Sequence, residues 1–388
     1  MVRRKRYLMF LCHHKSGAGI FARWFKILTL RLADGPVFLD SDYLEDLDSI
    51  FHVVRVETRA LVVLLTGQTL SRMWCAGEIG TAMVSEVTLV PVQSDEFCAP
   101  APSTLTQVVG SWSHSELASL IANGLTPVIV EVAYVRLCGK PMVAFDRFAS
   151  VPQHQAAAAA VLAQCRGGGG TGRPWEMTPM GVARVVLYST WGDGEGVMLI
   201  RVLQAILGDL LEDNIRVVSC TTECASAYLA MAAVVAVVLS HDALHSWEFA
   251  ACLASAADQD IELVTVVGGS FVFPGADFYK QVADGCHFSH VPRSSSRVKT
   301  VGVELEVSNS DLAAVFHRLL GILAIAITPH ASASKIGLEV GELAQRVQSL
   351  QKTSRQALQR NASAMFFGRS QRKNRRAVHA SSSLMDLV

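Results

Sequence analysis

Short, continuously apolar runs alternate with longer amphipathic stretches over the first 150 residues. Runs such as Tyr7–Cys12 and Leu61–Leu65 are typical of strands that are buried on both faces of a sheet. Alternating strands and helices favour a parallel sheet covered by helices on both sides. The pattern predicts strands at 7–12, 36–39, 61–65 and 87–92, and helices at 20–32, 50–56, 71–83 and 127–137, the last closing the unit.

The same order of elements returns in the second half of the chain. Tryptophan opens the corresponding helix in both halves, as Trp74 and as Trp247. We therefore expect a tandem duplication. In each half two glycines stand five and seven positions beyond the end of the first strand: Gly17 and Gly19 after Cys12, and Gly194 and Gly196 after Ser189. The second set of strands is expected at 184–189, 215–219, 234–239 and 263–267, with helices at 197–211, 247–256 and 311–323.

Between the two units the composition changes, with an alanine run at 156–160 and a glycine run at 167–170. Such a stretch predicts an interdomain linker. The expected organisation is a first domain over residues 1–150, a linker over 151–178 and a second domain over 179–330.

Residues 331–388 form a third kind of sequence. Five apolar residues spaced alternately by four and three positions predict a heptad helix of coiled-coil type. The end of the chain, 369–376, is a basic tail that we expect to be disordered, and it could serve as a nuclear address, a tether to an anionic surface or simply a solvated tail. The heptad residues are Ile336, Val340, Leu343, Val347 and Leu350.

Composition narrows the class of protein. Of the 388 residues, 51% are hydrophobic and 18% are charged, and the 34 basic residues balance the 34 acidic ones, so no global field attracts nucleic acid or membrane. No apolar run reaches the length of roughly 18–20 residues that a spanning helix needs. Nine cysteines lying mostly in apolar runs favour reduced thiols. We expect a cytoplasmic protein, with a nuclear location possible because of the basic tail.

Five motifs in the first half resemble the Toll/interleukin receptor (TIR) family. Phe10–His14 resembles the opening strand of these domains, Val37–Asp40 their second strand and Leu61–Thr66 their third. Trp74–Glu78 matches the family's Trp-Cys-x-x-Glu motif, and Trp112–His114 its late Trp-Ser-His. The resemblance covers residues 6–138 and implies an α/β fold, with two flavodoxin-like three-layer domains on parallel central sheets if the second half is a degenerate copy.

The resemblance implies that Glu78 is the catalytic glutamate that cleaves the bond between nicotinamide and ribose in NAD. A carboxylate suits this reaction because positive charge builds up on the ribose as an oxocarbenium ion. Trp74 is four positions before Glu78, so both would share one helix face. Alternatively, Trp74 is core packing and Glu78 is an ordinary solvated residue. No cofactor and no metal is expected, and NAD is the substrate.

Residues after the first two strands would complete the site, because ligands of open parallel sheets bind at the carboxyl ends of the strands. Together with Trp74, the expected substrate-binding residues are Cys12, His13, His14 and Asp40. Cys12 stands where the family often has serine, which removes a strong hydrogen-bond donor. The acidic segment that follows corresponds to the family's assembly loop, although an ordinary solvated loop is the alternative. Its candidate contact residues are Asp42, Leu44, Glu45 and Asp46.

The second half lacks the glutamate, because Ala251 stands four positions beyond Trp247. We expect this copy to be an assembly or regulatory partner of the first. Its segment Gly192–Gly196 hints at a dinucleotide turn without completing the motif. A zinc site is disfavoured because the cysteine and histidine pairs capable of binding it are far apart; they are Cys220 with Cys224, and Cys286 with His287 and His290.

These observations predict a signal-transduction protein of the innate-immunity type that cleaves NAD to nicotinamide and ADP-ribose, that is, an NAD nucleosidase (glycohydrolase). Its partners would be NAD and other TIR domains, with self-association. The alternative is a non-catalytic TIR scaffold or adaptor that mediates protein–protein assembly, and fold analogy alone does not choose between the two.

Overall fold

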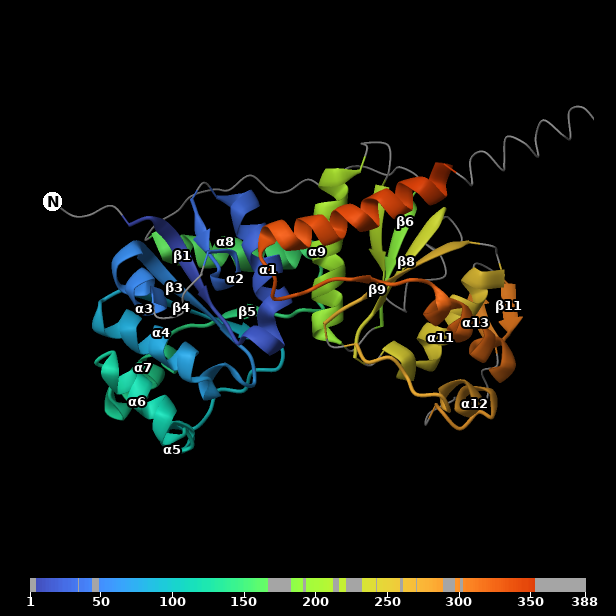
Figure 1. Ribbon diagram of the computed structural model, residues 1–388. Helices are drawn as coiled ribbons and strands as arrows, with labels where there is room; N and C mark the ends of the chain where they lie inside the picture. The colour runs from blue at the N-terminus through green and yellow to red at the C-terminus, as the bar shows by residue number, and fades with distance from the viewer. Residues whose placement is uncertain are drawn as a thin grey trace, which may run out of the picture.

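The computed structural model describes residues 5–33, 35–43, 49–166, 183–190, 193–211, 216–220, 232–241, 243–258, 261–269, 271–288, 297–300 and 303–352. Two α/β units follow one another along the chain, each built on a five-stranded sheet (Figure 1). A two-stranded antiparallel hairpin of β10 (Arg297–Thr300) and β11 (Val303–Glu306) belongs to the second unit.

The first sheet has the strand order β2-β1-β3-β4-β5, and its paired strands are parallel. This is the flavodoxin-like order, in which the chain winds from β1 to one side, where β2 lies, and then to the other side with β3, β4 and β5. The strands are β1 (Tyr7–Cys12), β2 (Val37–Phe38), β3 (Thr58–Leu65), β4 (Thr88–Ser94) and β5 (Val143–Phe145).

Successive residues of β1 enter different cores, as the period of two in a strand requires. Met9 and Leu11 face α1 (Lys15–Leu32) and α8 (Val151–Arg166). Phe10 and Cys12 enter the opposite core, which contains residues of α4 (Met73–Val84) and α7 (Pro127–Cys138). Helices therefore cover both faces of the sheet. The shorter helices of this half are α2 (Asp40–Tyr43), α3 (Ile50–His52), α5 (Pro102–Gly110) and α6 (His114–Ala122), with the π-helical turn η2 (Val53–Glu57) and the 3-10 turn η3 (Thr69–Ser71).

The second sheet repeats this topology. Its order, β12-β9-β8-β6-β7, has the first strand of the half between the second and the third, as in the first sheet. The fold prediction of two flavodoxin-like three-layer domains is thereby confirmed. The strands are β6 (Ala183–Tyr188), β7 (Arg216–Cys220), β8 (Val234–Leu239), β9 (Glu262–Val267) and β12 (Ile325–Ala326); the helices are α9 (Gly194–Leu210), the 3-10 turn η5 (Ala243–His245), α11 (Trp247–Asp258), α12 (Phe278–Ala283) and α13 (Asn309–Gly321).

The two halves share one hydrophobic core. Helix α1 packs against α9, and one apolar cluster includes Met9 and Leu11 from β1 together with Val185 and Leu187 from β6. Figure 1 shows α1 and α9 between the two sheets. The halves are therefore joined by continuous apolar packing.

Residues 333–352 form a helix that crosses α1 and α9 (Figure 1). Ile336, Val340, Leu343 and Val347 are buried in the shared core, and Leu350 packs against it. The apolar stripe was expected to form a coiled coil, but it faces the chain's own helices. The coiled-coil prediction is wrong for this reason, while the helix itself is confirmed.

The linker prediction is also wrong for residues 151–166, which form α8. Ala158, Val161 and Leu162 of this helix are buried, and α8 packs against α1 and β5. Alanine-rich sequence favours helix, and here the small side chains let the helix lie close to its neighbours. It is α8, after β5, that completes the first unit, and not α7. Residues 167–178 lie outside the described part of the chain.

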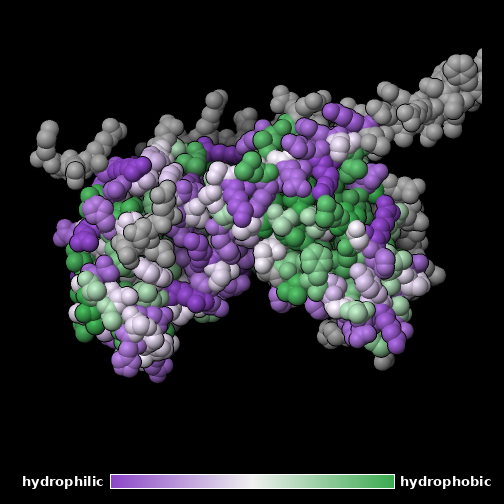
Figure 2. Space-filling view, in the orientation of Figure 1, coloured by the Kyte–Doolittle hydropathy of each residue, from purple (hydrophilic) through white to green (hydrophobic). Residues whose placement is uncertain are grey.

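Within the described ranges, no single helix is long and apolar enough to cross a membrane; α6 and α7 pass that test only as a pair, bent by 84°. Cys12, Cys75, Cys165 and Cys252 are free and buried, as expected for thiols in apolar runs. In the view of Figure 2, apolar surface is more extensive on the second half than on the first.

Candidate functional site

The expected site residues of the first half come from three elements that end or begin at one edge of the sheet. β1 ends at Cys12, and His13 and His14 lead directly into α1. β2 is followed by α2, which begins at Asp40, and the turn after β3 leads to α4, which contains Glu78. In the parallel sheet these carboxyl ends share one edge, so the topology gathers the predicted residues.

Glu78 is buried, with 6% of its surface exposed. Its Oε2 atom has no hydrogen-bond partner, and its carboxyl group accepts a hydrogen bond from the Cys12 thiol. Burial raises the pKa of Glu78 to about 8, and the nearby Asp40 carboxylate adds to this effect. At neutral pH, Glu78 is therefore predominantly a protonated acid in this conformation. The alternative of a solvated helix residue is wrong.

The two cysteines beside Glu78 are packed as thiols. Burial raises the pKa of Cys12 well above its usual value, and the neighbouring Cys75 and Glu78 raise it further. The Cys75 thiol donates a hydrogen bond of 3.3 Å to the carbonyl oxygen of His13. Because the thiolate is the nucleophilic form, Cys12 is not a nucleophile here. It joins the Glu78 carboxyl to the end of β1.

His13, the residue after Cys12, lies beside Asp40. Its Nδ1 is 3.2 Å from the Leu11 carbonyl oxygen, and its Nε2 is 3.9 Å from Asp40 Oδ1. Burial lowers the pKa of His13, so the ring is neutral near pH 7. The Lys15 ammonium is 3.2 Å from the other carboxylate oxygen of Asp40. The structure thus brings together Cys12, His13, Asp40 and Glu78 at one sheet edge.

His14 points along the start of α1. Its Nε2 is 2.7 Å from Ser16 Oγ, and its Nδ1 lies only 2.9 Å from where a Cβ on Gly17 would stand. Gly17 therefore makes room for the His14 ring. This glycine has a packing role in the turn after β1.

A residue of the second half joins this edge. The His330 ring lies against Gly19, with its Nδ1 2.4 Å from where a Cβ would stand. His13, Lys15 and Asp40 are near enough to His330 to influence its pKa, which burial lowers. Sequence reasoning missed this histidine because it is separated from Gly19 by most of the chain.

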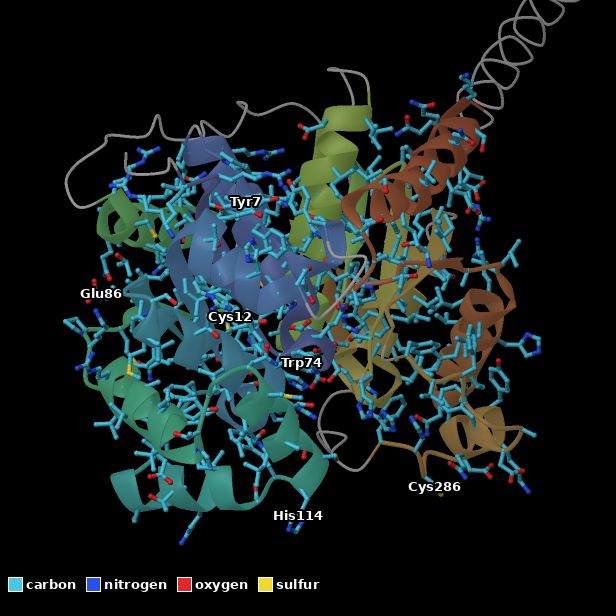
Figure 3. All side chains as sticks on the ribbon, turned by 60° about the vertical axis from the view of Figure 1, so that its left-hand side comes forward. Tyr7, Cys12, Trp74, Glu86, His114 and Cys286 are labelled. Carbon is cyan, nitrogen blue, oxygen red and sulfur yellow. The ribbon has the colours of Figure 1, made fainter. Side chains whose placement is uncertain are left out.

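Trp74 is half-buried, and its ring packs on Phe51 at a centroid distance of 5.7 Å. Phe51 also contacts Gly77, where an added Cβ would lie 2.3 Å from the ring. The geometry gives Trp74 a packing role between α4 and α3, as the alternative had it. Figure 3 shows Cys12 and Trp74 in the first half of the molecule, away from Cys286.

The segment before α4 is held by two aromatic side chains. Trp112 Nε1 donates a hydrogen bond of 2.9 Å to the Ser71 carbonyl oxygen, and the Tyr134 hydroxyl donates one of 2.6 Å to that of Leu70. Ser113 forms a capping box with Glu116 at the start of α6. The Trp-Ser-His motif therefore positions the entry to α4, and Tyr134 is a supporting residue that the sequence did not indicate.

Of the candidate assembly-loop residues, only Asp42 is described; Leu44, Glu45 and Asp46 lie outside the described residues. The Asp42 side chain is 6% exposed and pairs with Arg23 at 2.6 Å and Lys26 at 2.7 Å. Its carboxylate is thus used inside the chain. A charge reversal at Asp42 would break these pairs and would not report on assembly.

The second half has no carboxylate at the position that corresponds to Glu78. Ala251 is buried in α11, among the apolar residues that cover this face of the second sheet. The described residues contain no cluster of histidine, cysteine or carboxylate groups that could hold a metal ion. Cys224 and His290 lie outside the described part of the chain.

Comparisons with known proteins give little beyond this geometry. No protein-family model matches the chain, and no curated protein matches it. Among solved structures, it is similar to a chain in the structure of the activated Roq1 resistosome directly recognizing the pathogen effector XopQ (TIR domains). That match has 16% identity and a TM-score of 0.30, and covers 40% of this chain and 97% of the other. A match with so low an identity and TM-score supports no conclusion about function. The fold of both halves rests on the order of their strands, and the likeness of the first half to TIR domains rests on its motifs.

Proposed function

We propose that the first half cleaves NAD to nicotinamide and ADP-ribose, with Glu78 as the catalytic carboxylate. The observation that carries the proposal is the position of Glu78: buried, with one oxygen unpartnered, at the edge where open parallel sheets bind ligands. Unpartnered buried carboxylate oxygens are costly to a fold and are typical of functional sites.

The chemistry needs only one such group. The bond between the nicotinamide nitrogen and the anomeric carbon breaks, its electron pair neutralises the pyridinium, and the ribose becomes an oxocarbenium ion. Water adds to that ion and releases a proton, so that the products are nicotinamide, ADP-ribose and H⁺. An ionised Glu78 facing the ribose stabilises the developing positive charge. The positive pyridinium of bound NAD favours this ionised form because it lowers the pKa of a neighbouring carboxyl.

In the described conformation Glu78 is closed off from solvent, so catalysis requires this edge to open. His13 and Lys15 both pair with Asp40 at this edge, and we expect these three residues to contact the substrate after opening. Cys12 would position Glu78 by its hydrogen bond.

The test is release of nicotinamide from NAD by the full chain, compared with Glu78→Gln. Glu86→Gln is the matched control, because Glu86 follows the same helix but is exposed. We expect the wild type and Glu86→Gln to release nicotinamide at similar rates. Glu78→Gln should lower the rate by at least about 100-fold, because it removes a charge-stabilising group. Equal release by all three proteins would refute the assignment of Glu78.

We also propose self-association through α7, because this helix exposes an apolar stripe. Val128, Val132 and Val135 are 67%, 44% and 53% exposed, and Ile121 of α6 adds a further exposed apolar side chain. Such stripes mark protein–protein contact surfaces. Val132→Glu should lower the mass observed at high protein concentration by light scattering, whereas an unchanged mass would exclude this face.

A further inference from the structure

The second half gathers polar side chains at the carboxyl edge of its own sheet. Ser189 and Thr190 follow β6, Ser240 follows β8, and Asp193 immediately precedes α9. Ser189, Thr190 and Ser240 are at most 2% exposed. The place between the ends of β6 and β8 is where the winding of this sheet reverses, the usual ligand position in such folds.

These buried oxygens have no hydrogen-bond partner. This holds for the hydroxyl groups of Ser189, Thr190 and Ser240 and for Asp193 Oδ2. Buried polar groups are normally paired, so several unpaired ones in one place call for an explanation by function. Asp193, Gly194, Glu195 and Gly196 belong to the incomplete dinucleotide-turn motif of the sequence.

Three of the oxygens converge on one glycine. A Cβ on Gly196 would lie 3.0 Å from Ser240 Oγ, 3.1 Å from Asp193 Oδ2 and 3.2 Å from Ser189 Oγ. The absence of a side chain at Gly196 thus leaves the oxygens close together around the first turn of α9.

Arg147 of the first half stands beside this cluster. Its Cζ lies 2.5 Å from where a Cβ on Gly194 would stand, and its Nη1 is 3.8 Å from Glu195 Oε1. Asp95 binds the same guanidinium through two contacts of 2.8 Å. The start of α9 is therefore flanked by a cation that carboxylates already neutralise.

The charges around Ser189, Asp193 and Ser240 indicate which kind of ligand could bind there. Asp193 disfavours an anion, whereas the positive end of the α9 helix dipole disfavours a metal cation. Burial raises the pKa of Glu195 to about 8, so this carboxyl group is largely uncharged at neutral pH. Two hydroxyls and a carboxylate oxygen match neutral groups that both donate and accept hydrogen bonds, as the neighbouring hydroxyls of a sugar do. We propose that the second half binds the ribose of a nucleoside or nucleotide through Ser189, Asp193 and Ser240.

Because these oxygens have no contact with solvent, binding is coupled to a local opening of this edge. The inference does not depend on NAD cleavage in the first half. The second half, which lacks the catalytic glutamate, would then have a ligand-binding role.

The test titrates the full chain with adenosine, and with 2′,3′-dideoxyadenosine, which keeps the base and the 5′-hydroxyl but lacks the neighbouring 2′- and 3′-hydroxyls. Saturable binding of adenosine by calorimetry is expected, with affinity on the order of tenfold or more above that of dideoxyadenosine. Ser189→Ala and Ser240→Ala should each weaken adenosine binding by about tenfold. Without ligand, both variants should melt no lower than the wild type, because each loses an unpaired buried hydroxyl.

Two controls separate this site from others. Thr265→Val removes a paired buried hydroxyl in the same half, which donates a bond of 2.9 Å to Leu319, and should lower the melting temperature while keeping adenosine binding. Glu78→Gln should also keep adenosine binding, whether or not it releases nicotinamide. Absence of adenosine binding, equal binding of both nucleosides, or unchanged binding in the two serine variants would each overturn the proposal. A melting shift by phosphate or Mg²⁺ equal to that by adenosine would overturn it too.

Discussion

The backbone amide of Ala333 donates a hydrogen bond of 2.7 Å to Asp42 Oδ1, joining the start of the last described helix to α2 of the first half. The other oxygen of Asp42 binds Arg23 and Lys26, and Arg23 in turn donates to the carbonyl oxygen of Ala331 at 2.8 Å. One carboxylate thereby fixes the end of the second half beside the candidate site of the first.

Asp42→Ala should destabilise the protein by roughly 3–5 kcal/mol, because it leaves two buried cations without their partner. The matched control is Asp209→Ala, which breaks the pair with Arg31 at an aspartate 72% exposed and should cost at most about 1 kcal/mol. Urea denaturation measures both. Hydrogen exchange should quicken at residues 331–335 only in Asp42→Ala, and similar losses of stability in the two variants would contradict this account.

The buried state of Glu78 should be visible in the pH dependence of stability. Its pKa is raised to about 8 in the folded protein from 4.5, so the folded state binds the proton more tightly than the unfolded state. This contribution is fully present below about pH 4.5 and is lost as the pH rises toward about 8. Glu78→Gln should remove the contribution of Glu78 and stabilise the protein at pH 8 by roughly 1–3 kcal/mol. Glu195, whose pKa burial also raises to about 8, keeps its own contribution over the same pH range. A slope as steep in the variant as in the wild type would contradict the raised pKa of Glu78.

The rate of NAD cleavage should also depend on the ionisation of Glu78, but it should rise with pH where the stability falls. If the ionised form of Glu78 is catalytic, kcat/KM should rise with pH up to an apparent pKa near 8 for the free protein. The test measures the rate of nicotinamide release at a series of pH values between about 6 and 9, spaced by about one pH unit. A kcat/KM that does not change over that pH range would show that turnover does not depend on the ionisation of Glu78.

Gly77 lets α4 and Phe51 approach each other. Gly77→Ala should therefore cost roughly 1–3 kcal/mol through overpacking against the Phe51 ring. Gly110→Ala, near the end of α5, meets no atom within 4 Å and should be neutral or slightly stabilising. Thermal melts of both variants give the comparison, and equal effects would show that the Phe51 contact is soft.

The stripe on helix 333–352 should behave as core. Leu343→Ala should cost roughly 2–5 kcal/mol, because Leu343 is fully buried. Leu338, on the same helix, is 77% exposed, and its change to alanine should alter stability by no more than about 0.5 kcal/mol. If the helix instead paired with a second copy of the chain, Leu343→Ala would lower the oligomeric mass, and light scattering at several concentrations distinguishes the two results.

Local pattern was enough to predict most strands and helices. The continuous apolar runs of β1 and β3 and the repeated order of strands and helices predict two parallel sheets, because both are properties of the chain itself. The position of Glu78 could be predicted from the motif at 74–78. Its burial and raised pKa could not, because they depend on Cys12 and Asp40 from other elements.

The sequence by itself determined the fold class, the duplication and the replacement of the glutamate by Ala251 in the second half. Tertiary structure decided which apolar stripes face inward: α8 and helix 333–352 were predicted to be linker and coiled coil, yet they pack into the core that joins the halves. It also decided the partners of Asp42, Glu78 and Gly196. The physical reason is that burial and long-range pairing depend on what surrounds a side chain, and those surroundings come from segments far away along the chain.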